Sequence, residues 1–177
     1  MGNLTTDDSL KEILDNHNVF DDEEYLNDKT YYDEMIGLYQ WYIEQGGEND
    51  RRFSCRYAGR EKGYGIFADL DIQKDSVIGV YTGLISNQSD NTDYTWEYAS
   101  NPMADSKQIE LGLDSRVFGN FLRFVNHDDD PNTESLAVPY KNRWHRIYVA
   151  IKNIAANEEV TVSYGDHYWS ARDYIKV

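Results

Sequence analysis

Hydrophobic residues in the first 50 positions recur with a helical period. An apolar series at Leu10, Ile13 and Leu14 has the spacing of one helix face. A second series begins at Tyr32, continues at intervals of three or four residues to Ile43, and is followed by two glycines. Glycine after the last periodic residue is a common stop signal for a helix. We therefore predict two amphipathic helices in residues 1–50.

From Arg51 onward the hydrophobic pattern changes to short runs with β character. The runs are rich in β-branched and aromatic residues and are separated by Gly, Asn and Asp, which favour turns. The pattern predicts an α+β chain that is mainly β, with an acidic helical extension at residues 1–50 and one β-rich domain at residues 51–177. The predicted strands are Phe53–Ala58, Val77–Tyr81, Tyr94–Tyr98, Gln108–Leu113, Arg146–Ile151 and Val160–Tyr164.

Negative charge is concentrated in the helical segment. The chain has 32 acidic and 17 basic residues, a formal net charge of −15, and residues 1–50 contain 14 of the acidic residues but only Lys11 and Lys29. Such a field repels phosphate backbones and attracts cationic partners. We therefore expect no direct binding to nucleic acid. The acidic helix faces are interpreted as solvated surface, with recruitment of a basic partner as the alternative.

Cys55 is the single cysteine of the chain. One cysteine cannot form an internal disulfide or, by itself, a thiolate zinc site, and its apolar neighbours predict a buried thiol. These features favour a reducing intracellular compartment, either the cytoplasm or nucleus or a host cell into which the protein is delivered. No apolar run has the length of a membrane span, and the first residues lack the layout of a classical secretory signal, so we expect neither.

Two local features between residues 62 and 83 are weak by themselves. In the segment 62–65, Lys-Gly-Tyr-Gly, the glycines let the main chain approach a ligand closely. The segment lacks the third glycine of a dinucleotide loop and the Gly-Lys-Ser/Thr of a phosphate loop, which excludes both nucleotide motifs. By itself it predicts a turn. Tyr81, which precedes a Thr-Gly pair, by itself indicates a half-buried strand tyrosine.

Two further features lie toward the C-terminal end. Residues 113–132 contain the pair Asn126-His127 and three consecutive aspartates at 128–130. Three aspartates in a row predict a solvated turn, or at most a loose cation site. The run Glu158–Gly165 has β character and ends in a tyrosine and a glycine, and by itself it indicates an edge strand.

Taken together, these four features resemble the SET domain of protein lysine methyltransferases over about residues 52–170. The resemblance is specific because many positions match in order. The run Glu159-Val160-Thr161-x-x-Tyr164-Gly165 follows the central signature at the family's usual distance. The central signature itself reads Asp114-Ser115-Arg116-x-x-Gly119-Asn120-x-x-Arg123-Phe124-x-Asn126-His127-x-x-x-Pro131-Asn132.

The resemblance implies a fold of small β-sheets, with the Asn126-His127 segment threaded under a C-terminal loop and helices in front. It implies S-adenosyl-L-methionine as cofactor on one face, a substrate lysine that enters from the other, and no metal. Tyr164 and Tyr81 are expected to line the lysine channel as catalytic residues, and Arg116 and Asn120 are expected to be structural. The expected cofactor-binding residues are Lys62, Gly63, Tyr64, Gly65, Tyr94, Arg123, Asn126, His127 and Trp169.

The sequence departs from many members of that family at three places. Asp128-Asp129 stand where eukaryotic members commonly have Ser-Cys, and the sequence has no cysteine clusters for zinc-bound flanking modules. Another group must then cover the adenine, and Trp169 is the candidate, with a position in the core as the alternative. Val162 stands where many relatives have Phe or Tyr, which leaves the number of methyl groups added open.

The chemistry accounts for these residue types. A free lysine has a pKa of about 10.4, so the neutral amine that must attack the sulfonium methyl is scarce at pH 7. Aromatic walls favour the neutral amine by desolvation, and a tyrosine hydroxyl can orient it. The sequence therefore predicts an S-adenosylmethionine-dependent protein-lysine N-methyltransferase that acts on a basic protein such as a histone tail. The alternative is a catalytically silent SET-like acidic interaction module.

Overall fold

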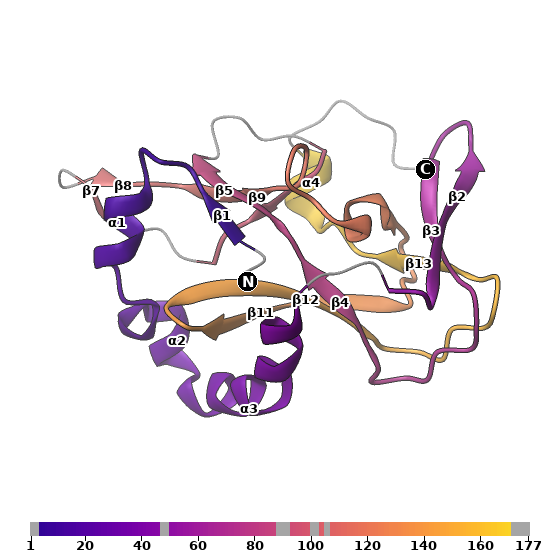
Figure 1. Ribbon diagram of the computed structural model, residues 1–177, viewed down its shortest axis with the longest axis horizontal. Coiled ribbons are helices and arrows are strands. Elements are labelled where there is room, and N and C mark those ends of the chain that lie inside the picture. The colour runs from indigo at the N-terminus through magenta and orange to yellow at the C-terminus, as the bar shows by residue number, and fades with distance from the viewer. Residues whose placement is uncertain (1–3, 47–49, 88–92, 100–102, 105–106, 171–177) are drawn as a thin grey trace. The chain divides into compact units, whose positions relative to one another are not determined.

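The computed structural model describes residues 4–46, 50–87, 93–99, 103–104 and 107–170 (Figure 1). The chain forms two compact units, each assembled from three separate segments. Segments far apart in the sequence therefore fold together within each unit. Unit 1 consists of Met1–Glu48, Gly79–Arg123 and Leu136–Ile147, and unit 2 consists of Asn49–Ile78, Phe124–Ser135 and Tyr148–Val177.

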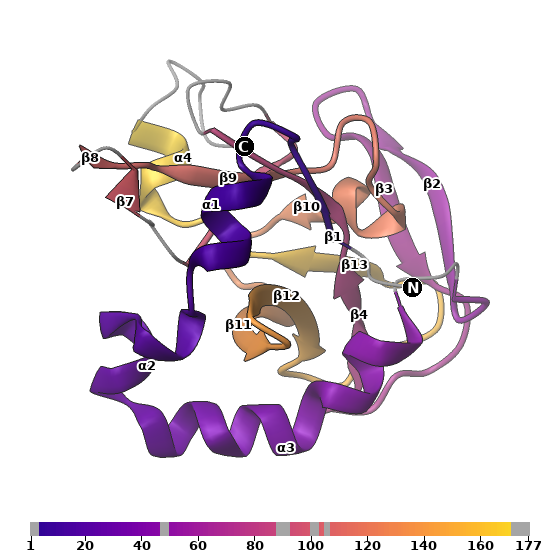
Figure 2. The same cartoon turned by 60° about the vertical axis from the view of Figure 1, so that its left-hand side comes forward.

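Helices follow one another in the N-terminal segment of unit 1 (Figure 2). The helices α1 and α3 confirm the two that the hydrophobic period predicts. The short helix α2 was not predicted, because its apolar residues, Tyr25 and Leu26, are adjacent and show no helical spacing. The bounds are α1 Lys11–Asn16, the 3-10 helix η1 Val19–Asp21, α2 Glu23–Asn27 and α3 Lys29–Gln45.

The helix α3 has well-defined ends and one buried face. The side chain of Asp28 accepts a hydrogen bond from a backbone N–H of the first turn, and the helix ends at Gly46, whose φ is 87°. Tyr32 and Ile43 are buried on its inner face. The ring of Tyr32 packs edge-on against Trp144 at 5.1 Å between centroids. The inner face of α3 is therefore part of the core of unit 1.

Unit 1 also contains a four-stranded sheet in the order β1-β5-β9-β6. Strand β1 runs parallel to β5, and β9 runs antiparallel to β5 and β6. All four residues of β9 are buried, so this strand lies in the core. The bounds are β1 Leu4–Thr6, β5 Gly83–Asn87, β6 Thr95–Glu97 and β9 Leu111–Asp114, with β7 Met103–Ala104 and β8 Lys107–Gln108 in a separate two-stranded sheet.

Unit 2 is built around the strand β13, Glu159–Val162. It pairs antiparallel with β3 on one side and parallel with β10 on the other, with Asn126 opposite Thr161. This pairing brings the Asn126-His127 segment against a C-terminal strand, whereas the prediction was a segment threaded under a C-terminal loop. The other elements of unit 2 are β2 Phe53–Gly59, β3 Gly63–Ala68, β10 Asn126–His127 and α4 Asp166–Ser170.

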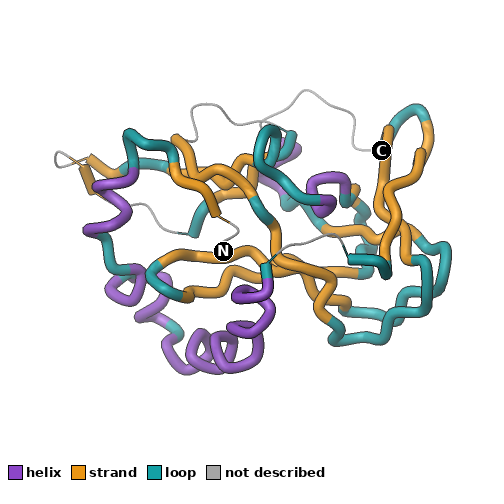
Figure 3. Tube along the Cα trace, viewed as in Figure 1, coloured by secondary structure: helices purple, strands orange, loops and turns teal. Residues whose placement is uncertain are grey.

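Three strands have residues in both units, because the chain changes unit within them. Strand β4 has the bounds that the sequence predicts, Val77–Tyr81. The other two are β11 Thr133–Tyr140 and β12 Arg143–Ala150, and a 3-10 helix, η3 Phe121–Phe124, precedes β10. Beyond residue 50 strands predominate (Figure 3), which confirms the mainly β character.

One local prediction was half right and one was wrong. The segment 62–65 by itself predicted a turn, and Lys62 lies in a turn, but residues 63–65 begin the strand Gly63–Ala68, with a φ of 72° at Gly63. Cys55 was predicted to be buried, but it is exposed. The period of two along β2 places Cys55 on the same face as Tyr57, whose side chain is also exposed. Among the described residues no helix is both long and apolar enough to cross a membrane.

Candidate active site

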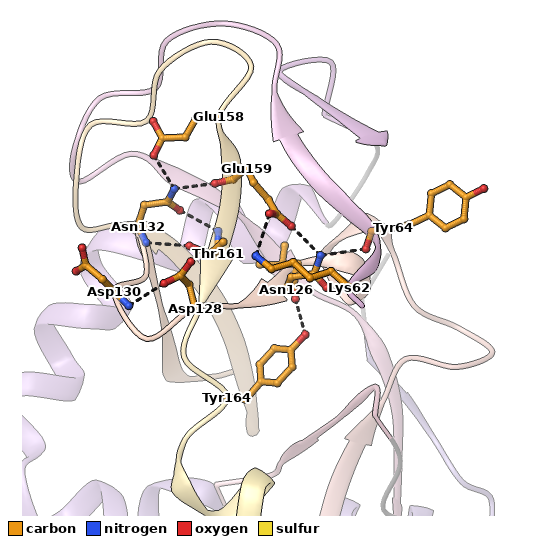
Figure 4. A network of polar contacts seen from close by, with 11 residues as sticks. Lys62, Tyr64, Asn126, Asp128, Asp130, Asn132, Glu158, Glu159, Thr161 and Tyr164 are labelled. Atoms are coloured by element: carbon orange, nitrogen blue, oxygen red, sulfur yellow. Dashed lines mark hydrogen bonds and ion pairs between the residues drawn. The ribbon is translucent and has the colours of Figure 1, made fainter. Parts of the chain in front are cut away.

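Asn126 lies at the centre of a polar network in unit 2 (Figure 4). Its Nδ2 donates to the main-chain oxygen of Tyr64 at 3.2 Å and to Oε1 of Glu159 at 2.7 Å. The pairing of β10 with β13 fixes its backbone opposite Thr161. The amide is thus oriented by three elements, and no described residue donates a hydrogen bond to its Oδ1.

Glu159 joins Asn126 to the predicted cofactor-binding lysine. While Oε1 accepts from Asn126, Oε2 lies 3.2 Å from Nζ of Lys62, and both side chains are partly buried. Sequence reasoning missed this role, because Glu159 was interpreted only as part of a strand motif. Its place beside the glycine-flanked tyrosine depends on the pairing of β13 with β3, which the sequence pattern does not give.

Gly65 is required by the same network. A Cβ at this position would lie 2.5 Å from Oε1 of Glu159 and 2.9 Å from Nδ2 of Asn126, both shorter than side-chain contacts allow. The adjacent Tyr64 directs its ring away from this network and is 59% exposed (Figure 4). The glycine therefore lets β3 approach the carboxylate and amide, while the tyrosine presents its carbonyl to Asn126.

Asn132 secures β13 from the other side. Its Oδ1 accepts from the backbone N–H of Thr161 at 2.9 Å, and its Nδ2 donates to the main-chain oxygen of Glu159 at 2.8 Å. Nδ2 also lies 3.1 Å from Oε1 of Glu158, which accepts. Because Asn132 is buried, these bonds are shielded from water and hold the register of β13 firmly.

Tyr164 follows β13 and is anchored at two points. Its hydroxyl donates to the main-chain oxygen of Val125 at 2.8 Å, and its backbone N–H donates to Nδ1 of His127 at 3.2 Å. Since Nδ1 accepts, the Nε2–H of His127 faces Asp129, whose Oδ1 lies 3.2 Å away. His127 is thus a buried connector between the threaded segment and Tyr164.

Trp169 packs into the same aromatic group. Its ring contacts His127 edge-on at 4.9 Å and lies nearly parallel to Tyr164 at 6.4 Å between centroids. Its indole Nε1–H is buried and finds no hydrogen-bond partner among the described residues. A buried donor without a partner is costly in a protein, so this position has an unmet hydrogen bond that a ligand can satisfy. Stacking of Trp169 on adenine stays a prediction.

The remaining predicted site residues form a cluster in unit 1. Tyr81 is 2% exposed, its hydroxyl donates to the main-chain oxygen of Tyr94 at 2.8 Å, and burial raises its pKa above the ordinary value. Arg123 donates through one nitrogen to the main-chain oxygens of Ser115 and Arg116, each at 3.2 Å. The structure thus brings Tyr81 and Tyr94 together in unit 1. The predicted site residues that belong to unit 2 are Lys62, Gly63, Tyr64, Gly65, Asn126, His127, Tyr164 and Trp169.

The two residues expected to be structural have structural contacts. Nδ2 of Asn120 donates to the main-chain oxygen of Val80 at 2.8 Å. Arg116 forms an ion pair with Asp114 at 2.7 Å. Both contacts lie within unit 1 and fix the segment that carries the central signature.

The three aspartates at 128–130 are engaged with protein groups. Asp129 faces His127, Asp130 pairs with Lys152, and Asp128 accepts from the backbone N–H of Asp130. In the part of the chain that the structure describes, no group of three His, Cys, Asp or Glu side chains could hold a metal ion. The aspartates are therefore a turn with local partners.

Comparison with known proteins decides the family. The family model of the SET domain matches residues 63–165, more than half of the chain. The chain belongs to the SET-domain family. The matched range includes Asn126, Glu159 and Tyr164 but neither Lys62 nor Trp169, and the match confirms the predicted resemblance.

Curated relatives of this SET domain include histone-lysine methyltransferases. The chain is 27% identical over 117 residues to histone-lysine N-methyltransferase EZH2 of Chaetomium thermophilum, which covers 60% of the chain and 8% of that protein. It is 28% identical over 121 residues to human histone-lysine N-methyltransferase EHMT1, 66% of the chain and 9% of that protein. A SET domain-containing protein of Phaeosphaeria nodorum is 31% identical over 112 residues, 63% of the chain and 17% of that protein. The chain therefore spans a minor part of these relatives.

Solved structures share the SET fold. The crystal structure of KRYPTONITE in complex with mCHH DNA, H3(1-15) peptide and SAH has a TM-score of 0.55 and 25% identity, and covers 67% of this chain and 25% of that one. The Chaetomium thermophilum PRC2 complex in an autoinhibited conformation bound to S-adenosylmethionine has a TM-score of 0.53 at 24% identity, covering 67% and 16% of the chains. At 24% identity, the similarity to the PRC2 complex shows a shared fold and nothing further.

Proposed function

We propose that this SET-domain protein is an S-adenosylmethionine-dependent protein-lysine N-methyltransferase. The observation that carries the proposal is the joint anchoring of Asn126 and Tyr164, which are held within one unit by Glu159 and by the main chain at Val125. A network that orients both a ligand-facing amide and a tyrosine hydroxyl is suited to positioning two reactants. The names of the relatives as histone-lysine methyltransferases support the same activity.

The residues of unit 2 fit S-adenosylmethionine. That molecule has a carboxylate, an ammonium group and an adenine, and Nζ of Lys62 is a suitable cation for the carboxylate. Oδ1 of Asn126, to which no described residue donates, can accept from the ammonium. The buried Nε1–H of Trp169 can donate to a heterocycle. When bound, the cofactor supplies a methyl group activated by a sulfonium.

Tyr164 positions the amine of the substrate. Because its hydroxyl proton is directed at the Val125 carbonyl, its oxygen lone pairs are the part that faces a ligand, and they accept a hydrogen bond from the lysine nitrogen. In this proposal the hydroxyl acts by orientation and not as a strong base. The neighbouring rings of His127 and Trp169 help to exclude water.

Deprotonation of the substrate lysine sets the energetic demand. Removing the proton from an amine of pKa about 10.4 at pH 7 costs about 4.6 kcal/mol. Desolvation among aromatic side chains lowers that cost, and alignment of the two reactants supplies on the order of 7–11 kcal/mol. The role of Tyr81 as a second channel tyrosine, and those of Tyr94 and Arg123 at the cofactor, stay predictions from the family pattern.

The substrate that we propose is a basic protein such as a histone. The net charge of −15 attracts lysine- and arginine-rich chains, and two of the named relatives act on histones. A nuclear or cytoplasmic location, or delivery into a host cell, follows from such a substrate. The number of methyl groups transferred depends on the space beside Val162. A valine side chain has a smaller volume than the Phe or Tyr that many relatives have at this position.

The decisive experiment supplies methyl-labelled cofactor and a panel of basic proteins, including core histones, and locates the label by mass spectrometry. The matched control is Tyr164→Phe, which keeps the ring and removes the hydroxyl. We expect label on lysine with the unaltered protein and almost none with the variant. A protein that binds the cofactor in calorimetry but labels no lysine, or binds none at all, would favour the silent interaction module.

A further inference from the structure

The outward face of α3 carries large apolar side chains that the core does not use. Leu38 is 60% exposed and Trp41 is 59% exposed, and Tyr31 and Tyr42 are exposed as well. Spacings of three, four and seven residues place all four on one side of the helix, away from the buried Tyr32. We name these four residues the α3 strip. Soluble proteins seldom expose such a group of apolar side chains unless it binds a partner.

The α3 strip lies on a firmly held helix. Trp41 and Tyr42 are in edge contact at 4.9 Å, and Tyr31 packs edge-on against the buried Tyr32 at 5.1 Å. Near the C-terminal end, Glu44 accepts from Nζ of Lys141 at 2.9 Å and from the hydroxyl of Tyr140. A partner that binds the strip therefore meets side chains that are already ordered, which reduces the entropic cost of binding.

The charge on the strip selects the partner. Two carboxylates of α3 have charged partners. Asp33 pairs with Lys29 of the same helix at 2.5 Å, and Glu44 pairs with Lys141 outside the helix. Glu34 has no charged partner among the described residues, and it precedes Leu38 by one helical turn on the same face. The uncompensated carboxylate of Glu34 thus lies beside the α3 strip, and residues 1–50 as a whole contain 14 acidic and two basic residues.

We propose that the α3 strip, with Glu34, docks a lysine- or arginine-rich segment of the protein substrate other than the one that presents the target lysine. Arginine and lysine stack on aromatic rings such as Trp41, and their aliphatic stems cover apolar surface such as Leu38. Glu34 supplies the opposite charge. As a surface for substrate, the strip rests on the proposed methyltransferase function.

A second copy of the chain does not suit this surface. In a symmetric dimer the same patch meets itself, which brings two copies of Glu34 to one interface and adds no positive charge from the strip. Two chains of net charge −15 also repel each other. The same field disfavours an acidic peptide, a nucleic acid or an anionic membrane. A cationic segment with some apolar side chains is the occupant that satisfies both the charge and the exposed rings.

The first test measures binding without catalysis. A fluorescein-labelled peptide of repeated Lys-Leu-Arg-Ala units is titrated with the full chain and followed by fluorescence anisotropy. We expect Trp41→Ala to weaken binding about tenfold, as truncation of an aromatic anchor does. Glu34→Lys should weaken it further, with a smaller effect at high salt. Leu70→Ala and Glu134→Gln, which alter exposed residues outside α3, are matched controls and should leave the affinity unchanged.

Each other outcome of the binding test overturns the docking surface. Equal affinities of the unaltered protein, Trp41→Ala and Glu34→Lys would do so. If a peptide of Lys-Ser-Arg-Ala units binds as tightly as the Lys-Leu-Arg-Ala peptide, charge alone accounts for binding and the apolar side chains of the α3 strip do not contribute. Dimerisation in sedimentation that Trp41→Ala removes, without peptide binding, would assign the strip to a second copy. Thermal unfolding confirms that each variant is folded, which is expected because the altered side chains are exposed.

The second test separates docking from catalysis. For a basic protein substrate that is methylated, Trp41→Ala should raise KM several-fold and leave kcat unchanged, since a docking contact made equally in the ground state and the transition state is uniform binding. An unchanged KM would contradict the proposed docking surface and would leave the proposed methyltransferase activity unaffected. If peptide binding depends on Trp41 but the protein methylates no substrate, the methyltransferase proposal is contradicted. The α3 strip then remains a binding surface for basic partners.

Discussion

Tyr164 is the residue on which the proposed reaction depends most directly. Replacing it with Phe removes the hydroxyl bond to the Val125 carbonyl but keeps the ring beside His127. We expect methyl transfer to fall about 100-fold or more, as loss of a positioned polar group does. Cofactor affinity in calorimetry should stay within a few-fold, because the hydroxyl holds no part of the cofactor-binding network. Full activity of Tyr164→Phe would remove it from the catalytic role.

Glu159 contacts two of the predicted cofactor-binding residues, Asn126 and Lys62. Glu159→Gln keeps an acceptor for Asn126 and loses the ion pair with Lys62, whereas Glu159→Ala loses both. We expect cofactor affinity to fall slightly in the first variant and about tenfold in the second, because the half-buried amide of Asn126 then keeps only the Tyr64 carbonyl as acceptor. Calorimetry measures both, with Glu134→Gln as a charge-matched control. Equal affinities in the Gln and Ala variants would show that the bond to Asn126 does not matter.

His145 gives unit 1 a pH-dependent stability. Its Nε2 lies 3.2 Å from the Tyr140 carbonyl, its Nδ1 is buried without a partner among the described residues, and burial lowers its pKa to about 4. The unfolded chain, with a histidine pKa of about 6.5, therefore binds more protons between these values. Stability should be full above about pH 6.5 and should fall by about 3 kcal/mol as pH drops toward 4.

The control for this loss is His145→Gln, because carboxylates also titrate under acidic conditions. Urea unfolding of both proteins between about pH 7 and pH 4.5 isolates the histidine contribution. We expect a steeper decline in the protein that keeps His145. Parallel declines would mean that this histidine takes up its proton in the folded state.

Among the elements, the N-terminal helices contribute to the core of unit 1. Leu14 and Val19 are almost completely buried, the Nε1–H of Trp144 donates to Asp22 at 2.9 Å, and Arg143 donates to the main-chain oxygen of Leu14. Deletion of residues 1–50 should therefore lower the melting temperature by more than about 10 °C at every salt concentration, since several large side chains lose their packing. Scanning calorimetry at low and high salt measures this. Unchanged melting would show that the segment is a dispensable extension.

The same elements show what local pattern can predict. The strand Val77–Tyr81 was predicted with its observed bounds, because a run of β-branched residues buried on both faces has one interpretation. The strand Gly63–Ala68 was missed as a strand, because glycine is weighted as a turn former and its partner β13 lies far along the chain. Cys55 was misplaced because apolar neighbours do not say which face of an outer strand they occupy.

For the candidate site, a motif names residues in their order along the chain even where their partners are unknown, and their roles stay predictions. Asn126, His127 and Tyr164 were taken from the motif, and the structure places them in one connected group. Glu159 was in the motif without a role. Its function arises only when β13 pairs with β3 and β10, so a residue-by-residue transfer could not assign it.

For the whole molecule, the net charge of −15 predicts a salt-sensitive encounter with basic substrates. The Debye length falls from about 10 Å at 0.1 M to about 3 Å at 1 M salt, so steering of a cationic protein fades across this range. We expect kcat/KM for a basic protein to fall at least about tenfold, and that for a short peptide of zero net charge to change little. Initial rates at several salt concentrations measure both. Equal salt dependence would attribute the effect to the ionic sensitivity of the enzyme itself.

The order of strands in unit 2 has a consequence for synthesis on the ribosome. Strand β3 pairs with β13 through Ile66 and Val160, so β3 emerges more than 90 residues before its partner exists. At translation rates of about 5–20 residues per second, its edge waits on the order of ten seconds. A nascent chain that stops before Glu159 has no carboxylate to hold Asn126. A cofactor site that rests on Lys62 and Asn126, as proposed, is therefore complete only after Glu159 has left the ribosome, late in synthesis.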